Sequence, residues 1–236
     1  MEYISIIFTH WSMNEERAKL SLFSLYSLIA SVKNLPVEII VIDNGGTPSL
    51  YKVFNKLVKE EKISCYIRNS HNMSFGYARN QGLAMPVGDF VCVVDNDLKY
   101  EKGWLERCVK FLEDHPDKKI YATPLQYPTA GMVERYSQGE LDGWALNMRA
   151  GSNCWVMRSK YFFEVGFFLN HRIAGSIWTD EAVRKGYLAA VDPVKLVKDL
   201  GLRKGYNLGV ANPIKKKLLN GKEVYFNRDE YQISHK

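Results

Sequence analysis

Two aspartates separated by one residue form the part of the sequence best suited to chemistry. Asp95, Asn96 and Asp97 directly follow an apolar run at residues 89–94. Side chains two residues apart on an extended chain project to the same side, so the two carboxylates repel each other unless a cation lies beside them. Hard oxygen ligands suit Mg²⁺ or Mn²⁺, which usually bring substrate phosphates with them. The alternative is a surface turn, because Asp and Asn also satisfy backbone groups where a strand ends.

Polar residues also end two earlier apolar runs. Thr9 and His10 end the first run, and Asp43 and Asn44 end the second. Open parallel sheets bind ligands at the carboxyl ends of their strands. We therefore expect the three polar strand ends to gather at one site, with His10 in a hydrogen-bonded structural role.

The first half of the chain alternates apolar runs with helical patterns, which predicts right-handed β-α-β crossovers and an α/β fold with a mostly parallel central sheet. Strands are expected at residues 3–9, 37–42, 63–68 and 89–94, and the helices between them end near residues 32, 60 and 84.

The first helix carries two local signals. Ser12 and Glu15 match the S-x-x-E pattern of a capping box at its start. Its expected apolar face is formed by Leu20, Phe23, Leu25 and Leu28.

The second half is less regular. It predicts helices at 104–112, 159–165 and 180–185, strands at 120–123 and 154–157, and a long loop or small hairpin over 124–150. Neither a linker nor a repeat divides the sequence, so we expect a single domain over residues 1–236.

Composition narrows the class of protein. Of 236 residues, 46% are hydrophobic and 25% charged, which excludes a disordered chain. Apolar stretches fall well short of the ~20 residues that span a bilayer, and the N-terminus lacks a secretion-signal pattern. The four cysteines lie far apart without a C-x-x-C pair, which argues against a disulfide framework or structural zinc. We expect a cytoplasmic protein.

The positive charge is concentrated near the C-terminus. The net charge is +6, and residues 195–222 hold eight Lys or Arg against one acid, Asp199. This basic window suits a phosphate-bearing substrate, an anionic membrane surface at the inner face of a membrane, or plain solvation. It lacks the interleaved aromatics of a nucleic-acid module, so nucleic acid is not an expected partner.

An ordered set of motifs resembles the family 2 glycosyltransferases of the GT-A type. The family commonly shows N-x-G, A-R-N-x-G, G-(E/D)-(Y/F) and D-x-D segments after a D-(D/N)-G-(S/G)-T turn. Here the corresponding residues are 4–9, 38–47, 72–82, 88–91 and 95–97. The resemblance covers about residues 3–190.

The resemblance implies a Rossmann-like GT-A fold and a metal-dependent transfer of a sugar. The donor would be a nucleoside diphosphate sugar, a UDP-sugar by resemblance, and the acceptor a hydroxyl of a carbohydrate or lipid-linked sugar, with inversion and with Mn²⁺ or Mg²⁺ as cofactor. Residues 1–100 would form the nucleotide-sugar half, 101–190 the acceptor half and 191–236 a basic extension.

Residue by residue, the family's roles fall on the polar strand ends. The resemblance assigns nucleotide-sugar binding to Thr9, Asp43, Asn44, Arg79, Asp95 and Asn96, and metal binding to Asp97, Asp95 and Asp199. Thr9 and Asp43 would contact the base and ribose, Arg79 would lie near the diphosphate, and Asp97 would be the main metal ligand. Asp43 as a turn residue and Arg79 in a surface salt bridge are the structural alternatives.

Metal binding by Asp199 is the least specific of these roles. It stands where the family sometimes has a metal-binding His, and it equally balances neighbouring lysines. Arg203 and Lys204 follow it and would close over the diphosphate.

The catalytic residues by resemblance are Asp180 and Glu181, at the place of the family's E-D pair. The interval to Gly186-Tyr187 is shorter than usual, so either carboxylate could be the base; Asp180 matches the Asp of E-D. A helix cap is the structural alternative for Asp180. One of Trp144, Trp155 and Trp178 is expected to stack on a sugar.

Two other functions compete. A sugar-phosphate nucleotidyltransferase would need a Gly-rich loop after the first strand, where residues 9–14 contain no glycine. A catalytically silent nucleotide-sugar-binding or scaffold protein is compatible with the altered acidic-pair spacing and the missing histidine.

Overall fold

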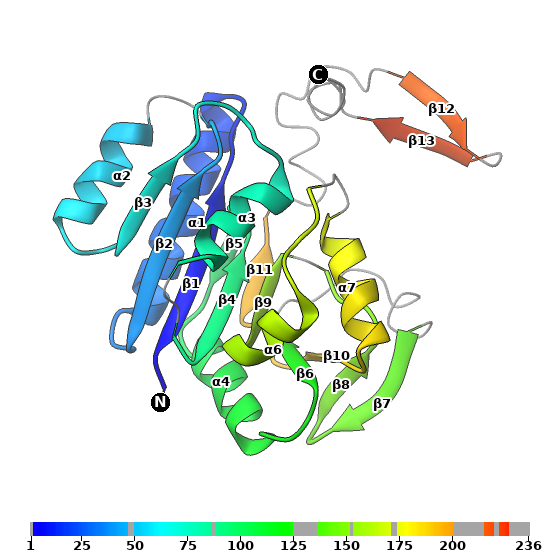
Figure 1. Cartoon of the computed structure of the whole chain (residues 1–236). Helices are drawn as coiled ribbons and strands as arrows, with labels where there is room; N and C mark the ends of the chain where they lie inside the picture. Colours follow the sequence, from blue (N-terminus) through cyan, green and yellow to red (C-terminus); the bar gives the residue numbers. More distant parts are fainter. Residues whose placement is uncertain are drawn as a thin grey trace.

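A large sheet forms the centre of the computed structural model, which describes residues 2–46, 50–85, 88–124, 136–151, 153–170 and 174–200, and the backbone of 215–219 and 222–226. Within these residues the sheet has nine strands in the order β3-β2-β1-β4-β9-β6-β10-β8-β7 (Figure 1). Their bounds are β1 Ile4–His10, β2 Val37–Asp43, β3 Cys65–Arg68, β4 Phe90–Val94, β6 Ile120–Thr123, β7 Ser137–Leu141, β8 Trp144–Asn147, β9 Cys154–Arg158 and β10 Leu188–Val191.

Helices cover both faces of the sheet. They are α1 Glu15–Val32, α2 Leu50–Lys59, α3 Phe75–Leu83, α4 Trp104–Asp114, α6 Ser159–Val165 and α7 Ala174–Arg184. One core contains Ile6 and Phe8 of β1 with apolar residues of α1, α2 and α4, and the other contains Ile7 with those of α3, α6 and α7. Because successive strand residues face opposite sides, β1 feeds both cores and is buried throughout.

The predicted parallel core is confirmed. β3, β2, β1 and β4 pair in parallel, and β10 pairs in parallel with β6. β9 runs antiparallel to β4 and β6, and the β7–β8 hairpin joins the sheet antiparallel to β10. The α/β fold with helices on a large central sheet is therefore as expected, with antiparallel strands added on the side of the second half.

Short strands escaped the sequence prediction. β10 and β11 (Val197–Asp199) lie in the segment expected only as helical turns and basic tail, and α7 begins at Ala174, before the predicted 180. β11 pairs antiparallel with β5 (Leu98–Tyr100), directly after the two aspartates. β12 (Lys215–Leu219) and β13 (Lys222–Phe226) form a separate hairpin. Strands of three or four residues carry too little periodicity to be found without their partners.

The expected capping box at the start of α1 was wrong. The helix starts at Glu15, and Asn14 is its cap, accepting a hydrogen bond of 2.9 Å from the backbone N–H of Arg17. Ser12 lies too early to cap it; its hydroxyl is 3.3 Å from Nε2 of His10. Asn and Ser are equally good helix caps, so Asn14 is the cap because it directly precedes the first helical residue.

The expected apolar face of α1 was wrong at Phe23, which is 50% exposed. Serines take part of the buried face instead. Ser24 Oγ accepts from the backbone N–H of Leu98 at 3.1 Å, and Ser31 Oγ accepts from Trp104 Nε1 at 3.0 Å. The hydroxyls are buried because they satisfy donors of β5 and α4.

None of the helices in the residue ranges given above is both long enough and apolar enough to cross a bilayer.

Candidate functional site

The three polar strand ends lie together at the carboxyl edge of the parallel strands. His10 of β1 is the register partner of Asp43 of β2, and Phe8 is the partner of Val94, so the residues after β4 lie beside the end of β1. The backbone N–H of Asn44 donates to the carbonyl of His10 at 2.8 Å. The expected gathering of these residues is confirmed, and this edge is the candidate site.

Asp95 is held by a buried arginine. Arg79 has no exposed surface, and its NH2 donates to Asp95 Oδ1 at 2.5 Å. The guanidinium carbon lies 3.9 Å from the ring centre of Phe75 and 5.3 Å from that of Phe168. Burial lowers the pKa of Arg79, and the charge of Asp95 opposes that shift. The ion pair is buried rather than at the surface, so Arg79 acts on the site through Asp95.

Asp97 lies among charges of both signs. Its Oδ2 is 3.6 Å from NH1 of Arg17 in the first turn of α1. Burial, joined by the charges of Asp95 and Asp199 and opposed by that of Arg17, raises the pKa of Asp97 to about 7. A carboxylate that resists losing its proton because of neighbouring carboxylates is one that a cation would stabilise.

The β5–β11 pair brings Asp199 to this place. Asp199 is the register partner of Leu98, and the backbone N–H of Leu200 donates to the carbonyl of Asp97 at 2.8 Å. Asn153, just before β9, donates from Nδ2 to Asp199 Oδ2 at 3.0 Å. Two sequence-distant carboxylates, Asp97 and Asp199, thus lie near one another, as the hypothesis of a shared cation requires.

The oxygens of Asp97 and Asp199 fit a hard divalent cation by chemistry and charge. In the part of the chain that the structure describes, no group of three or more His, Cys, Asp or Glu side chains forms a ready-made metal cage. A site with only two protein carboxylates suits Mg²⁺ or Mn²⁺, because these ions keep bound waters and take substrate phosphates as further ligands.

Asp43 closes a turn. Its Oδ1 accepts from the backbone N–H of Gly46 at 2.7 Å and its Oδ2 from the hydroxyl of Tyr66 at 3.0 Å, with Nε of Arg68 at 3.7 Å. The carboxylate has no exposed surface, and this burial raises its pKa despite those bonds. A direct contact with a nucleotide base stays a prediction; the bonds shown are those of the turn alternative.

Asn44 joins β2 to the loop before α3. Its Nδ2 donates to Asn72 Oδ1 and to the carbonyl of Ser74, and its Oδ1 accepts from Asn69 and from the backbone N–H of Met73, all at 3.0 Å. The side chain is used fully by the protein, and it fixes the rim of the site.

His10, Thr9 and Asn96 line the inner end of the site. His10 is buried, with Nδ1 2.6 Å from Ser21 Oγ, and burial lowers its pKa to about 3, so the structural role is confirmed. Asn96 donates to the carbonyl of Trp11 at 2.9 Å. Thr9 is 8% exposed, and its Oγ1 is buried without a hydrogen-bond partner among the described groups, so its contact with a nucleotide stays a prediction.

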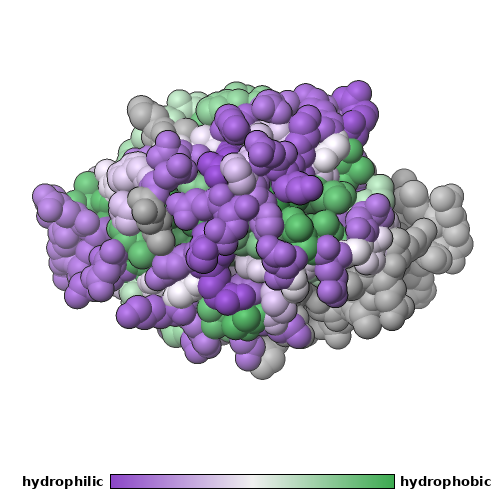
Figure 2. Space-filling model, turned by 90° about the horizontal axis from the view of Figure 1, so that it is seen from below, coloured by the Kyte–Doolittle hydropathy of each residue, from purple (hydrophilic) through white to green (hydrophobic). Residues whose placement is uncertain are grey.

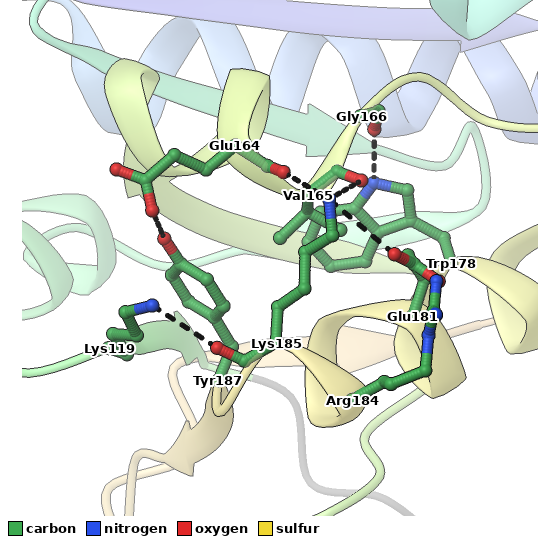
Figure 3. A network of polar contacts seen from close by, with 9 residues as sticks. All are labelled: Lys119, Glu164, Val165, Gly166, Trp178, Glu181, Arg184, Lys185 and Tyr187. Atoms are coloured by element: carbon green, nitrogen blue, oxygen red, sulfur yellow. Dashed lines mark hydrogen bonds and ion pairs between the residues drawn. The ribbon is translucent and has the colours of Figure 1, made fainter.

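The two candidate catalytic acids on α7 differ in their surroundings. Asp180 is 54% exposed and forms an ion pair with Arg149, which follows β8. Glu181 pairs with Arg184 and, at 3.5 Å, with Lys185, and these cations lower its pKa (Figure 3). Lys185 also donates to the carbonyl of Glu164, so Glu181 belongs to a network that ties α7 to α6. Of the two carboxylates, Asp180 is the more exposed, and Glu181 is paired with more cations.

The expectation that one tryptophan stacks on a sugar was wrong. Trp144 stacks on Phe111 with 4.2 Å between ring centres, and Trp155 and Trp178 lie 4.7 Å apart in the second core. All three are at most 6% exposed. Burial of their large apolar surface stabilises the fold, and all three tryptophans belong to the core.

Three residues of the site escaped the sequence analysis: Arg17, Arg149 and Asn153. Arg17 carried a signal, because a cation in the first turn of a helix opposes the helix dipole and so needs another partner. Asn153 would follow from knowing that β9 is antiparallel, since its start then lies at the carboxyl end of β4. Arg203 and Lys204, expected to close over the diphosphate, lie outside the described residues.

Comparison with known families follows from this geometry. The sequence profile described as glycosyl transferase family 2 matches residues 14–179. The chain belongs to glycosyl transferase family 2. The matched region includes the residues whose motifs resembled this family, among them 38–47, 72–82 and 95–97.

One curated relative is the glucosyl-dolichyl phosphate glucuronosyltransferase of Haloferax volcanii. It is 25% identical over 114 residues, which are 48% of this chain and 35% of that protein. The chain thus spans about a third of that relative's length.

Solved structures share the fold at low identity. GalNAc-T7 with UDP, GalNAc and Mn²⁺ has a TM-score of 0.68 at 14% identity, over 93% of this chain and 47% of its own. The mannosyltransferase PcManGT of Pyrobaculum calidifontis, with GDP-Man and Mn²⁺, has a TM-score of 0.66 at 15% identity, over 87% and 59%. TarS of S. aureus has a TM-score of 0.63 at 18% identity, over 84% and 36%. At these identities the likeness shows the fold alone.

Proposed function

We propose that this chain transfers a sugar from a nucleoside diphosphate donor to an acceptor hydroxyl, with a divalent cation held by Asp97 and Asp199. The observation that carries the proposal is the cluster of carboxylates at the carboxyl edge, where Asp97 and Asp199 lie near one another and where burial, with the charges of Asp95 and Asp199, raises the pKa of Asp97. Such repulsion is costly, and a bound cation would relieve it.

Arg79 and Asp95 orient the donor side. Because two aromatic rings and the Asp95 carboxylate contact the buried Arg79 guanidinium, the arginine is fixed in place and holds Asp95 in turn. Asp95 Oδ2 can then accept a hydrogen bond from a donor hydroxyl such as that of a ribose. When bound, the cation at Asp97 and Asp199 stabilises the negative charge of the departing diphosphate.

Asp180 is the proposed base on the acceptor side. Asp180 is more than half exposed, whereas Glu181 is ion-paired with Arg184 at the end of α7 and with Lys185, the residue after it. Asp180 would take the proton from the acceptor hydroxyl as this attacks the sugar's C1 from the face opposite the diphosphate. That direction of attack inverts the anomeric centre. Arg149 holds the carboxylate in place through its ion pair.

The donor is proposed to be a UDP-sugar, with a GDP-sugar as the competing choice. The structures with UDP and with GDP-Man have the same fold, so fold does not decide between them. The name of the Haloferax volcanii relative includes a dolichyl phosphate sugar, which supports a lipid-linked sugar among the acceptors to be tested.

Hydrolysis of nucleotide sugars by the full chain tests the proposal. UDP-glucose, UDP-GlcNAc and GDP-mannose are incubated with Mn²⁺ or with EDTA, and released nucleoside diphosphate is measured. We expect Mn²⁺-dependent release with one of them, lost in Asp97→Asn. Mn²⁺-dependent binding of a nucleotide without any release, also in the presence of sugar and lipid-linked acceptors, would instead support the catalytically silent alternative.

A further inference from the structure

An exposed apolar ridge lies on α6 and the segment that follows it. Phe163, Phe167 and Leu169, here called the aromatic ridge, are 52%, 48% and 59% exposed. The rings of Phe163 and Phe167 are 6.1 Å apart, and the buried ring of Phe162 contacts both at about the same distance. The ridge is therefore supported from beneath, and its outer side faces water. On the face of the molecule in Figure 2, hydrophobic areas interrupt a mostly hydrophilic surface.

The ridge leads to the candidate site. The carbonyl of Leu169 lies so close to α3 that a Cβ on Gly76 would be 2.2 Å from it. The next residue, Asn170, accepts a hydrogen bond from Ser74 at the start of α3. Ser74 in turn accepts from Asn44 through its carbonyl. One end of the ridge thus adjoins the rim of the carboxyl edge, and the other lies on α6.

Cations surround the α6 end of the ridge. Lys160 is exposed one turn before Phe163, and Lys185 donates to the carbonyl of Glu164 at 2.6 Å. Lys119 donates to the carbonyl of Lys185 at 3.2 Å (Figure 3). Charged groups around α6 and the end of α7 are Lys119, Lys160, Arg184 and Lys185, with Glu164, Glu181 and the exposed Asp89 beside the start of α6. Arg184 and Lys185 are paired with Glu181, and four cations against three acids leave one net positive charge.

We propose that the aromatic ridge and its cationic rim dock the protein on a bilayer that contains anionic lipid, beside a lipid-linked acceptor. The acceptor part rests on the proposed function. Half-exposed aromatic side chains with lysines around them suit the bilayer interface. Each cation near an anionic surface strengthens binding about fivefold.

The small size of the ridge favours a bilayer over a second protein. A stable protein interface buries about 800 Å² on each partner and involves roughly 20 to 30 residues a side. Three side chains fall far short of that. A bilayer needs only a few inserted side chains, because cations around them add long-range attraction.

Vesicle co-sedimentation of the full chain tests the proposal. Vesicles of phosphatidylcholine with or without phosphatidylglycerol are used, and Phe163→Ser/Phe167→Ser is compared with the wild type. The matched control is Phe23→Ser/Tyr26→Ser on α1, whose side chains are 50% and 47% exposed on the other side of the sheet. Each half-exposed ring withdrawn from water is worth about fivefold, so the first variant should bind anionic vesicles about 25-fold more weakly. The control should bind as the wild type does.

Several results would overturn the docking proposal. These are no binding of the wild type to anionic vesicles, equal loss or equal retention in the two variants, and a concentration-dependent dimer that Phe163→Ser/Phe167→Ser abolishes. Equal melting temperatures of the three proteins confirm that folding is not the cause. Vesicle binding requires no turnover. If the wild type fails to bind vesicles but still hydrolyses a nucleotide sugar with Mn²⁺, the docking proposal is wrong and the proposed function is unaffected.

Discussion

Removal of the Arg79 charge should lower the free energy of unfolding, and the burial of the ion pair sets the size of the loss. Arg79→Met keeps an unbranched apolar stem but removes the guanidinium, which leaves Asp95 without its partner at 2.5 Å. Breaking a buried ion pair by removing one member costs about 3–5 kcal/mol. Asp95 retains 23% exposure, so water offsets part of this loss and we expect about 3 kcal/mol.

Equilibrium unfolding in urea measures this change. A loss of about 3 kcal/mol corresponds to a fall in melting temperature of roughly 6–12 °C for a domain of this size. The double variant Arg79→Met/Asp95→Asn removes the uncompensated charge, and it should recover at least ~1 kcal/mol relative to Arg79→Met alone. A loss below about 1 kcal/mol, or two changes that simply add, would refute the view that Arg79 acts through Asp95.

Three further outcomes are expected. The folded-state pKa of His10 is about 3, below the ordinary 6.5, so the free energy of unfolding should fall as pH drops below 6.5, by about 2–3 kcal/mol at pH 4.5. Urea melts should show a smaller fall in His10→Gln, and an equal fall in both proteins would contradict the buried neutral histidine. Asn44→Ala removes four hydrogen bonds to partly buried partners and should lower the free energy of unfolding by about 3 kcal/mol, whereas a loss within experimental error would contradict a structural role for Asn44. Asp180→Asn should bind nucleotide as the wild type does yet transfer sugar to the acceptor, with release of nucleoside diphosphate, at least ~100-fold more slowly, while Glu181→Gln stays within a few-fold; the reverse pattern would move the base by one residue.

The strands that carry the site could be predicted because their sequences are unusual. β1, β2 and β4 are continuous apolar runs, each followed at once by polar turn residues, and buried parallel strands read in that way. The meeting of their ends then follows from the direction of parallel strands. The family motifs added the identities of the site residues.

The roles of those residues could not be predicted, because tertiary contacts decide them. The motif named Arg79, but only the packing of Phe75 and Phe168 around it shows that it is buried beneath Asp95. Asn44 was expected to meet the donor, and its bonds to the loop before α3 became visible only in the structure.

Burial on helix faces was mispredicted for a related reason. Hydropathy favours Phe23 over Ser24, yet Ser24 is the buried one because Leu98 presents an N–H that needs an acceptor. The partner lies 74 residues away, so local sequence carries no trace of it.

Calorimetric titration of UDP into the wild type and Asp97→Asn, each with Mn²⁺ and with EDTA, tests the central claim most directly. The claim is that Asp97 and Asp199 hold a divalent cation that binds the donor diphosphate. We expect tight UDP binding by the wild type only with Mn²⁺, and loss of that gain in Asp97→Asn at an unchanged melting temperature. Equal UDP affinity in Mn²⁺ and EDTA, or a full Mn²⁺ effect in Asp97→Asn, would contradict it.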